Sequence, residues 1–144
     1  MAGWREAAAV AAGGVIGTGL RLILDAVIPH TDTEFPFSTL LINVGGSFAL
    51  GALVATLWRR AGTPNWLKVG LGAGTIGSFT TFSALIVSLV TEAHHGLWML
   101  AVLYLVLSVG LGLGAALLGL RVARPHRPMP PEIDMPPEID MVSE

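Results

Sequence analysis

The sequence predicts an all-α membrane protein with four transmembrane helices. Of its 144 residues, 53% are hydrophobic and only 12% are charged, which is not a soluble composition. A spanning helix needs about 20 mostly apolar residues, and such segments occupy residues 7–27, 37–58, 66–90 and 97–122. Tryptophans stand at segment ends, where indole prefers the membrane interface: Trp4, Trp58, Trp66 and Trp98. Residues 1–122 are therefore expected to form one transmembrane domain.

Residues 123–144 differ sharply in composition from the four apolar segments. This tail contains Met-Pro-Pro-Glu-Ile-Asp twice, and such a sequence cannot bury enough apolar surface to offset chain entropy. We expect it to be disordered. The chain has no cysteine, which excludes disulfides and thiolate chemistry. The histidines show no metal-ligand spacing: His30, His94, His95 and His126.

The first segment carries two charged residues on the same helical face as a row of small residues. Gly13, Gly17, Arg21 and Asp25 follow each other at four-residue spacing, so they share one side of a helix. The glycines are typical of helix packing. A guanidinium inside a span costs at least about 2.5 kcal/mol on insertion scales, so Arg21 should have a structural or functional role, with Asp25 as a candidate partner.

The second segment places Thr39, Asn43 and Ser47 on one line, again at four-residue spacing. The Asn43 amide offers two N–H donors and one acceptor, and these groups must find partners in hydrocarbon. The line indicates either a hydrogen bond between helices or a polar passage.

The third segment contains a stretch that disfavours a regular helix. Gly72, Gly74 and Gly77 lower helix propensity, and hydroxyl residues follow them at Ser78, Thr80, Thr81 and Ser83. We expect the helix to open at residues 77–80 and to release backbone carbonyls. Such backbone is tolerated in a membrane only inside protein or along a polar cavity.

The fourth segment is rich in leucine and glycine and has few polar residues. Tyr104 and Ser108 lie one turn apart. A hydroxyl in such a helix usually bonds the carbonyl four residues earlier, which is the simplest interpretation of Ser108.

Three of these segments resemble motifs of the CrcB/Fluc family of fluoride channels. The third-helix motif of that family, Gly-x-x-Gly-x-x-Thr-Thr-Phe-Ser-Thr-Phe, is similar to the run from Gly74 to Ser83, with Ala84-Leu85 replacing its last two residues. The second-helix motif, Gly-Thr-Leu-x-x-Asn-x-x-Gly-Ser-Phe, matches from Thr39 to Phe48, and the first-helix motif resembles the segment from Gly13 to Arg21.

The resemblance implies a passive channel that exports fluoride and relieves its toxicity. It implies these pore residues: Thr39, Asn43, Ser47, Thr81, Phe82, Ser83, Tyr104 and Ser108. It also implies an antiparallel, dual-topology-type dimer with a structural sodium ion at its centre, held by the backbone carbonyls of Gly77 and Thr80. Arg21, Gly74 and Leu85 would be structural. Hydroxyl and amide donors with a phenyl edge suit a small hard anion, although the residues alone leave water or another small solute open.

Two other functions compete with a channel. A small four-helix multidrug/proton exporter needs a membrane-embedded carboxylate, and the first helix has none near its centre. A membrane assembly protein needs only glycine faces, which would leave Asn43 and the hydroxyl-rich stretch without a purpose. An enzyme is not expected, because the spans contain no nucleophile–base pair or metal cluster.

The basic residues predict the orientation in the plasma membrane. One side of the four-span arrangement collects Arg5, Arg59, Arg60, Lys68, Arg121, Arg124 and Arg127. Positive residues favour the cytoplasm, so both termini should be inside. An antiparallel homodimer needs both orientations of one chain, and this charge bias opposes that. Together with Leu85 in place of a family phenylalanine, it favours a heterodimer with a homologous subunit, and a homodimer is the alternative.

Overall fold

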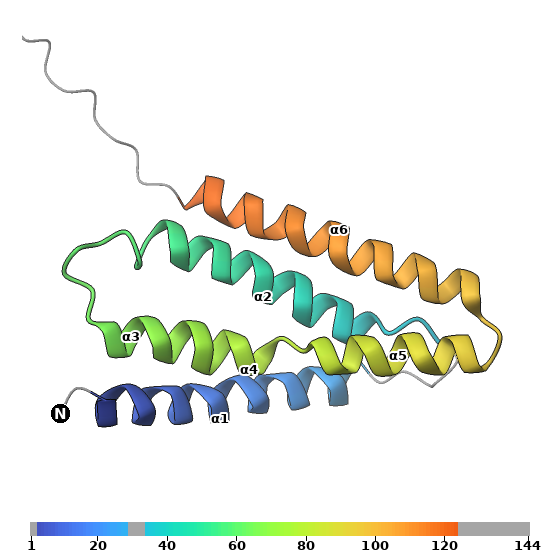
Figure 1. Ribbon diagram of the computed structural model, residues 1–144, viewed down its shortest axis with the longest axis horizontal. Coiled ribbons are helices and arrows are strands. Elements are labelled where there is room, and N and C mark those ends of the chain that lie inside the picture. Colours follow the sequence, from blue (N-terminus) through green and yellow to red (C-terminus); the bar gives the residue numbers. More distant parts are fainter. Residues whose placement is uncertain (1–2, 29–33, 124–144) are drawn as a thin grey trace, which may run out of the picture.

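The computed structural model describes residues 3–28 and 34–123, and within these ranges all regular secondary structure is helical (Figure 1). The elements in order are α1 (Gly3–Val27), α2 (Phe37–Ala55), α3 (Asn65–Val69), the π-helix η1 (Gly70–Ile76), α4 (Gly77–Phe79), α5 (Phe82–His94) and α6 (Trp98–Val122). Four helical stretches are long and apolar enough to cross a membrane: Gly3–Val27, Phe37–Ala55, Asn65–His94 and Trp98–Val122. We call Asn65–His94, which comprises α3, η1, α4 and α5, the third span. The all-α fold with four potential membrane spans is confirmed.

Three helix ends differ clearly from the sequence prediction. α1 begins at Gly3 rather than at residue 7, α2 ends at Ala55 rather than at residue 58, and α5 continues to His94, beyond the expected end at residue 90. Gly96 makes the turn between α5 and α6, with a φ of 76° that favours glycine. Hydropathy follows the apolar part of a helix, not the point where its hydrogen bonds begin or end, which accounts for these differences. The expected tail of residues 123–144 lies, except for Ala123, outside the described residues.

The helices pack through close contacts between small residues. α2 lies along α6, whereas α1 lies along the third span (Figure 1). Gly51 of α2 faces the backbone of Ala116, and Gly119 of α6 faces the backbone of Phe48, so neither glycine leaves room for a side chain. These contacts bring the backbones of α2 and α6 into direct contact.

The contact between α1 and the third span also depends on glycines that face the backbone of the neighbouring helix. Gly13 and Gly17 face the backbone around Thr75, and a Cβ atom on Gly74 would come within 2.8 Å of the Val10 carbonyl oxygen. Gly74 therefore leaves no room for a side chain between the third span and α1. In the wide π-helical turns of η1, the Thr75 hydroxyl donates to the Gly70 carbonyl at 3.2 Å.

Arg21 is half-buried on α1, and it does not form an ion pair with Asp25. Both residues lie in the described part of the chain, so the candidate pairing of Arg21 with Asp25 is wrong. Four-residue spacing brings two side chains to one face but does not require them to meet.

Replacing Gly17 by alanine should disturb the packing of α1. The new Cβ atom would collide with the Thr75 carbonyl oxygen and lie 2.9 Å from the Phe79 nitrogen, so we expect a loss of about 1–3 kcal/mol in unfolding free energy. Gly19→Ala is the matched control on the same helix, because nothing lies within 4 Å of its Cβ position. Thermal unfolding in detergent measures both, and equal stabilities would contradict this packing.

Candidate functional site: a polar hollow beside a non-helical step

Two residues in the third span leave the helical conformation. Thr80 and Thr81, between α4 and α5, have extended backbone angles (φ −75°, ψ 153° and φ −145°, ψ 120°). Gly77 itself is helical, with φ −63° and ψ −31°. The expectation that the helix opens from residue 77 is thus wrong in its starting point. Glycine permits an opening, but the backbone leaves the helix only where other groups offer hydrogen bonds.

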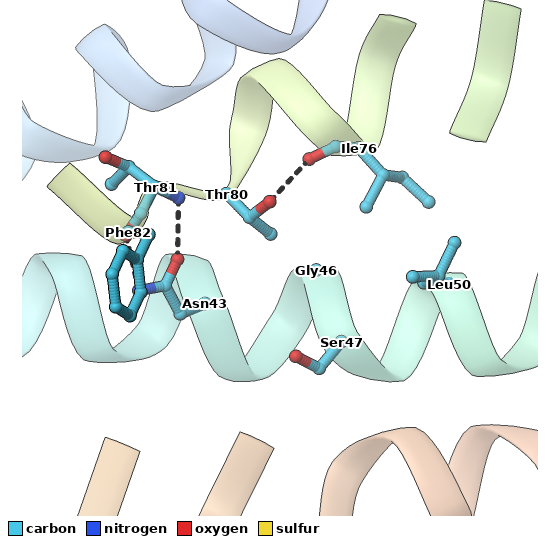
Figure 2. A pocket seen from close by; sticks show the side chains of 8 residues that line it. All are labelled: Asn43, Gly46, Ser47, Leu50, Ile76, Thr80, Thr81 and Phe82. Atoms are coloured by element: carbon cyan, nitrogen blue, oxygen red, sulfur yellow. Dashed lines mark hydrogen bonds between the residues drawn. The ribbon is translucent and has the colours of Figure 1, made fainter. Parts of the chain in front are cut away.

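Asn43 of α2 supplies those hydrogen bonds. The Thr81 amide donates to Asn43 Oδ1 at 2.8 Å, and Asn43 Nδ2 donates to the Thr81 carbonyl at 3.0 Å. Figure 2 shows the Asn43 side chain reaching from α2 to this step. A primary amide has two N–H groups, so one donor of Asn43 is not used by this pair of bonds.

The step also redirects two donors that a continuous helix would use. In such a helix the Gly77 carbonyl would accept from the Thr81 amide, and the Thr80 carbonyl from the Ala84 amide. The Thr81 amide bonds Asn43 instead, and the Ala84 amide donates to Thr81 Oγ1 at 3.2 Å. The carbonyls of Gly77 and Thr80 therefore lose their helical donors.

A hollow of about 240 Å³ opens between α2 and this step (Figure 2). It is lined by Asn43, Gly46, Ser47, Leu50, Ile76, Thr80, Thr81 and Phe82. The Phe82 side chain is 76% exposed in the single chain, so much of its ring is free for a partner. Amide, hydroxyl and aromatic-edge groups thus border one space, and no charged residue lines it.

A second group of polar residues is buried between α2, α5 and α6, and we call it the buried polar cluster. It consists of Thr39, Glu92, Tyr104 and Ser108 with the half-buried Ser88 at its side, and the hydroxyl of Tyr104 lies near the other four side chains. Tyr104 is fully buried, with its ring 5.4 Å from that of Phe35 in an edge-to-face contact. Leu85 packs with Leu40 against Tyr104, which gives Leu85 a structural position in the core.

Several atoms of the buried polar cluster have no hydrogen-bond partner within residues 3–28 and 34–123. These are the Tyr104 hydroxyl, the Ser108 hydroxyl and both carboxylate oxygens of Glu92. The interpretation of Ser108 as bonded to its own helix is therefore wrong. Leaving a buried polar group unpaired costs about 1–3 kcal/mol, so these atoms favour water or a polar ligand beside them.

The structure divides the sequence-predicted residues into two places. The hollow brings together Asn43, Ser47, Thr81 and Phe82, while Thr39, Tyr104 and Ser108 belong to the buried polar cluster. Ser83 is exposed, and its hydroxyl is 3.1 Å from Thr81 Oγ1.

Sequence reasoning missed Glu92, which is only 1% exposed. It lies beyond residue 90, where the third apolar segment was expected to end, so its carboxylate was not considered among the embedded groups. Leu85 and Leu89 pack in the core, and Glu92 follows on the same helical face. If the helix had been extended to residue 94, this spacing would have predicted that Glu92 is buried.

Comparison with known proteins identifies the family. The family described as CrcB-like protein, Camphor Resistance (CrcB), matches residues 8–120, a range that reaches from α1 to α6. The chain belongs to this CrcB-like family.

Individual CrcB-like relatives cover most of the chain. The fluoride-specific ion channel FluC of Granulibacter bethesdensis is 47% identical over 64% of this chain and 72% of its own length. FluC of Roseiflexus sp. is 38% identical over 81% of this chain and 94% of its own length. The fluoride-specific ion channel FluC 1 of Mycobacterium tuberculosis is 36% identical over 86% of this chain and 94% of its own length.

Removing the Tyr104 hydroxyl should not destabilise this CrcB-like protein. Tyr104→Phe deletes a buried hydroxyl that has no partner among the described residues, so its unfolding temperature should equal or exceed that of the wild type. Tyr104→Leu is the matched control, because it also removes the ring that packs on Phe35. It should cost about 1 kcal/mol or more. A large loss of stability in Tyr104→Phe would show that the hydroxyl has a structural hydrogen bond.

Proposed function

We propose that this chain forms a passive, fluoride-selective channel that exports fluoride across the plasma membrane and relieves its toxicity. The observation that carries the proposal is the uncharged hollow lined by Asn43, Ser47, Thr81 and Phe82 beside the non-helical step. It lies in a chain whose CrcB-like relatives are named fluoride-specific ion channels. Those names describe channels rather than enzymes.

The chemistry of the two polar regions supports an anion as the conducted species. The unused N–H of Asn43 and the unpaired hydroxyls of Tyr104 and Ser108 can each replace a water in the shell of a small anion. The exposed ring of Phe82 adds the positive edge of an aromatic quadrupole. Neutral donors bind an anion without holding it as tightly as a fixed cation would, which permits release.

Anion efflux from liposomes that contain only the purified protein tests this function. We expect rapid fluoride efflux without chloride efflux and without an imposed proton gradient. Asn43→Asp should lower fluoride efflux at least about ten-fold, because it places negative charge in the hollow. Ala61→Asp is the control, since it adds the same negative charge at an exposed loop position outside the hollow.

Two results would contradict passive fluoride conduction. Equal efflux from the Asn43→Asp and Ala61→Asp proteins would remove Asn43 from the pathway. Efflux that requires a proton gradient would favour the exporter instead, and Glu92 would then be the embedded carboxylate that such a transporter needs.

We further propose that the step at Thr80 and Thr81 is a functional break of the third span and that it holds a structural sodium ion. Carbonyl oxygens are suitable ligands for a hard cation where a membrane helix unwinds. The carbonyls of Gly77 and Thr80 fit this role, because their helical donors bond Asn43 Oδ1 and Thr81 Oγ1. In the proposed antiparallel dimer the ion would lie at the centre and stabilise the assembly, without being transported.

Replacing sodium tests this proposal without measuring conduction. In N-methylglucamine chloride the purified protein should unfold at a lower temperature than in sodium chloride at equal ionic strength, because a ligand that binds only the folded state stabilises it. Asn43→Leu should reduce the difference, since the step that frees these carbonyls would lose both hydrogen bonds that hold it. Identical unfolding temperatures in both salts would exclude a structural sodium ion.

We propose that both termini are cytoplasmic and that the second subunit is a homologous chain of opposite orientation. The starts of α1 and α3 and the ends of α2 and α6 lie at one end of the molecule (Figure 1). Among the described residues, these segments and the α2–α3 loop carry Arg5, Arg59, Arg60, Lys68 and Arg121. This bias favours one orientation. Leu85 is buried beside Tyr104 in this chain, so a heterodimer partner would have to supply the aromatic ring that Leu85 lacks.

Reporter fusions to the C-terminus measure the orientation directly. We expect almost all tails inside the cell and stronger fluoride conduction when a homologous subunit is co-expressed. A large fraction of tails outside, together with full conduction by this chain alone, would support the homodimer and contradict the heterodimer.

A further inference from the structure

A second hollow, of about 320 Å³, lies where α1 meets α3 at the basic end of the molecule, and we call it the interfacial hollow. It is lined by Trp4, Arg5, Ala8, Ala9 and Trp66. Trp4 and Trp66 are 69% and 38% exposed, so two indoles border an open space beside a guanidinium. Ala8 and Ala9 are small, and they leave the room between these larger side chains.

The interfacial hollow is fixed by contacts on both sides. A Cβ atom on Gly70 would lie 3.0 Å from the Ala9 Cβ, so α1 and the third span touch directly beneath it. At the exposed edge, Asn65 Nδ2 donates to Glu6 Oε1 at 2.7 Å and links the starts of α1 and α3. Backbone packing and this cross-link therefore fix the base and one edge of the interfacial hollow, and the side chains of Trp4, Arg5 and Trp66 border it.

The charge around the interfacial hollow favours an anion. The Glu6 carboxylate accepts from Asn65, and Arg5 has no ion pair within the described parts of the chain. Glu6 is the one acidic residue at this end among residues 3–28 and 34–123, where five basic residues gather. A guanidinium binds a phosphate with two parallel hydrogen bonds.

The surroundings identify the anion as part of a lipid. Tryptophan prefers the headgroup level of a bilayer, and a basic membrane-protein end faces the anionic leaflet. Further along α1, Val15 and Ile16 are 76% and 56% exposed, which offers apolar surface to acyl chains. We propose that the interfacial hollow binds the phosphate headgroup of an anionic phospholipid, with Arg5 as the phosphate ligand and the indoles of Trp4 and Trp66 as walls.

Native mass spectrometry of the full-length chain with added phosphatidylglycerol or phosphatidylcholine tests this site. Loading should take place at about 1 M ionic strength, where the Debye length is about 3 Å and general attraction to basic residues is screened. We expect Arg5→Gln to lower phosphatidylglycerol affinity at least about ten-fold, the effect of losing hydrogen bonds to a charged group. Phosphatidylcholine binding should change less, and the fluoride efflux of the protein is not part of this readout.

Arg59→Gln is the matched control, because Arg59 is a basic residue of the same end outside the interfacial hollow. It should bind phosphatidylglycerol as the wild type does, and Arg5→Lys, which keeps the charge without the planar fork, should lie between wild type and Arg5→Gln. Equal affinities of Arg5→Gln and Arg59→Gln would overturn the site. Displacement of the lipid by millimolar glycerol 3-phosphate would overturn the lipid as ligand and indicate a free phosphate site.

Discussion

The pair of hydrogen bonds between the Asn43 side chain and the Thr81 backbone holds the third span in a shape that a helix in a bilayer would not otherwise keep. An unpaired backbone group in hydrocarbon costs several kcal/mol, and the step at Thr80 and Thr81 interrupts the helical ladder. Asn43 gives the Thr81 amide an acceptor and the Thr81 carbonyl a donor. The hollow, the exposed ring of Phe82 and the released carbonyls all depend on this pair.

α2 contributes residues to both polar regions, the hollow and the buried polar cluster. Asn43 reaches the step, while Thr39, one turn earlier, belongs to the buried polar cluster near Tyr104. Gly46 lets Thr80 approach the α2 backbone, since a Cβ atom there would collide with the Thr80 methyl group. The close contacts of Gly51 with the Ala116 backbone and of Gly119 with the Phe48 backbone fix α2 against α6. The small residues of this chain thus position the polar ones, and a larger residue at these points would separate the helices.

The sequence was sufficient for what depends on hydropathy and local chemistry. Four potential spans follow from apolar length, and Asn43 was identified because an isolated amide in hydrocarbon needs partners. The partner itself could not be predicted, because Asn43 and Thr81 meet only through packing of two helices. For the same reason the paired state of Arg21 and the burial of Glu92 were misjudged. Spacing shows which residues share a face of one helix, but the neighbouring helices decide what that face meets.

Amide hydrogen exchange at Thr81 and Ala84 in the reconstituted protein tests the role of Asn43 most directly. Both amides bond side chains rather than helical carbonyls. We expect the Thr81 amide to be protected in the wild type and to exchange at least about ten-fold faster in Asn43→Leu, because the variant removes its acceptor; Ala84 should be affected less. A Thr81 amide that exchanges at the same rate in both proteins would contradict the role of Asn43 in holding the step.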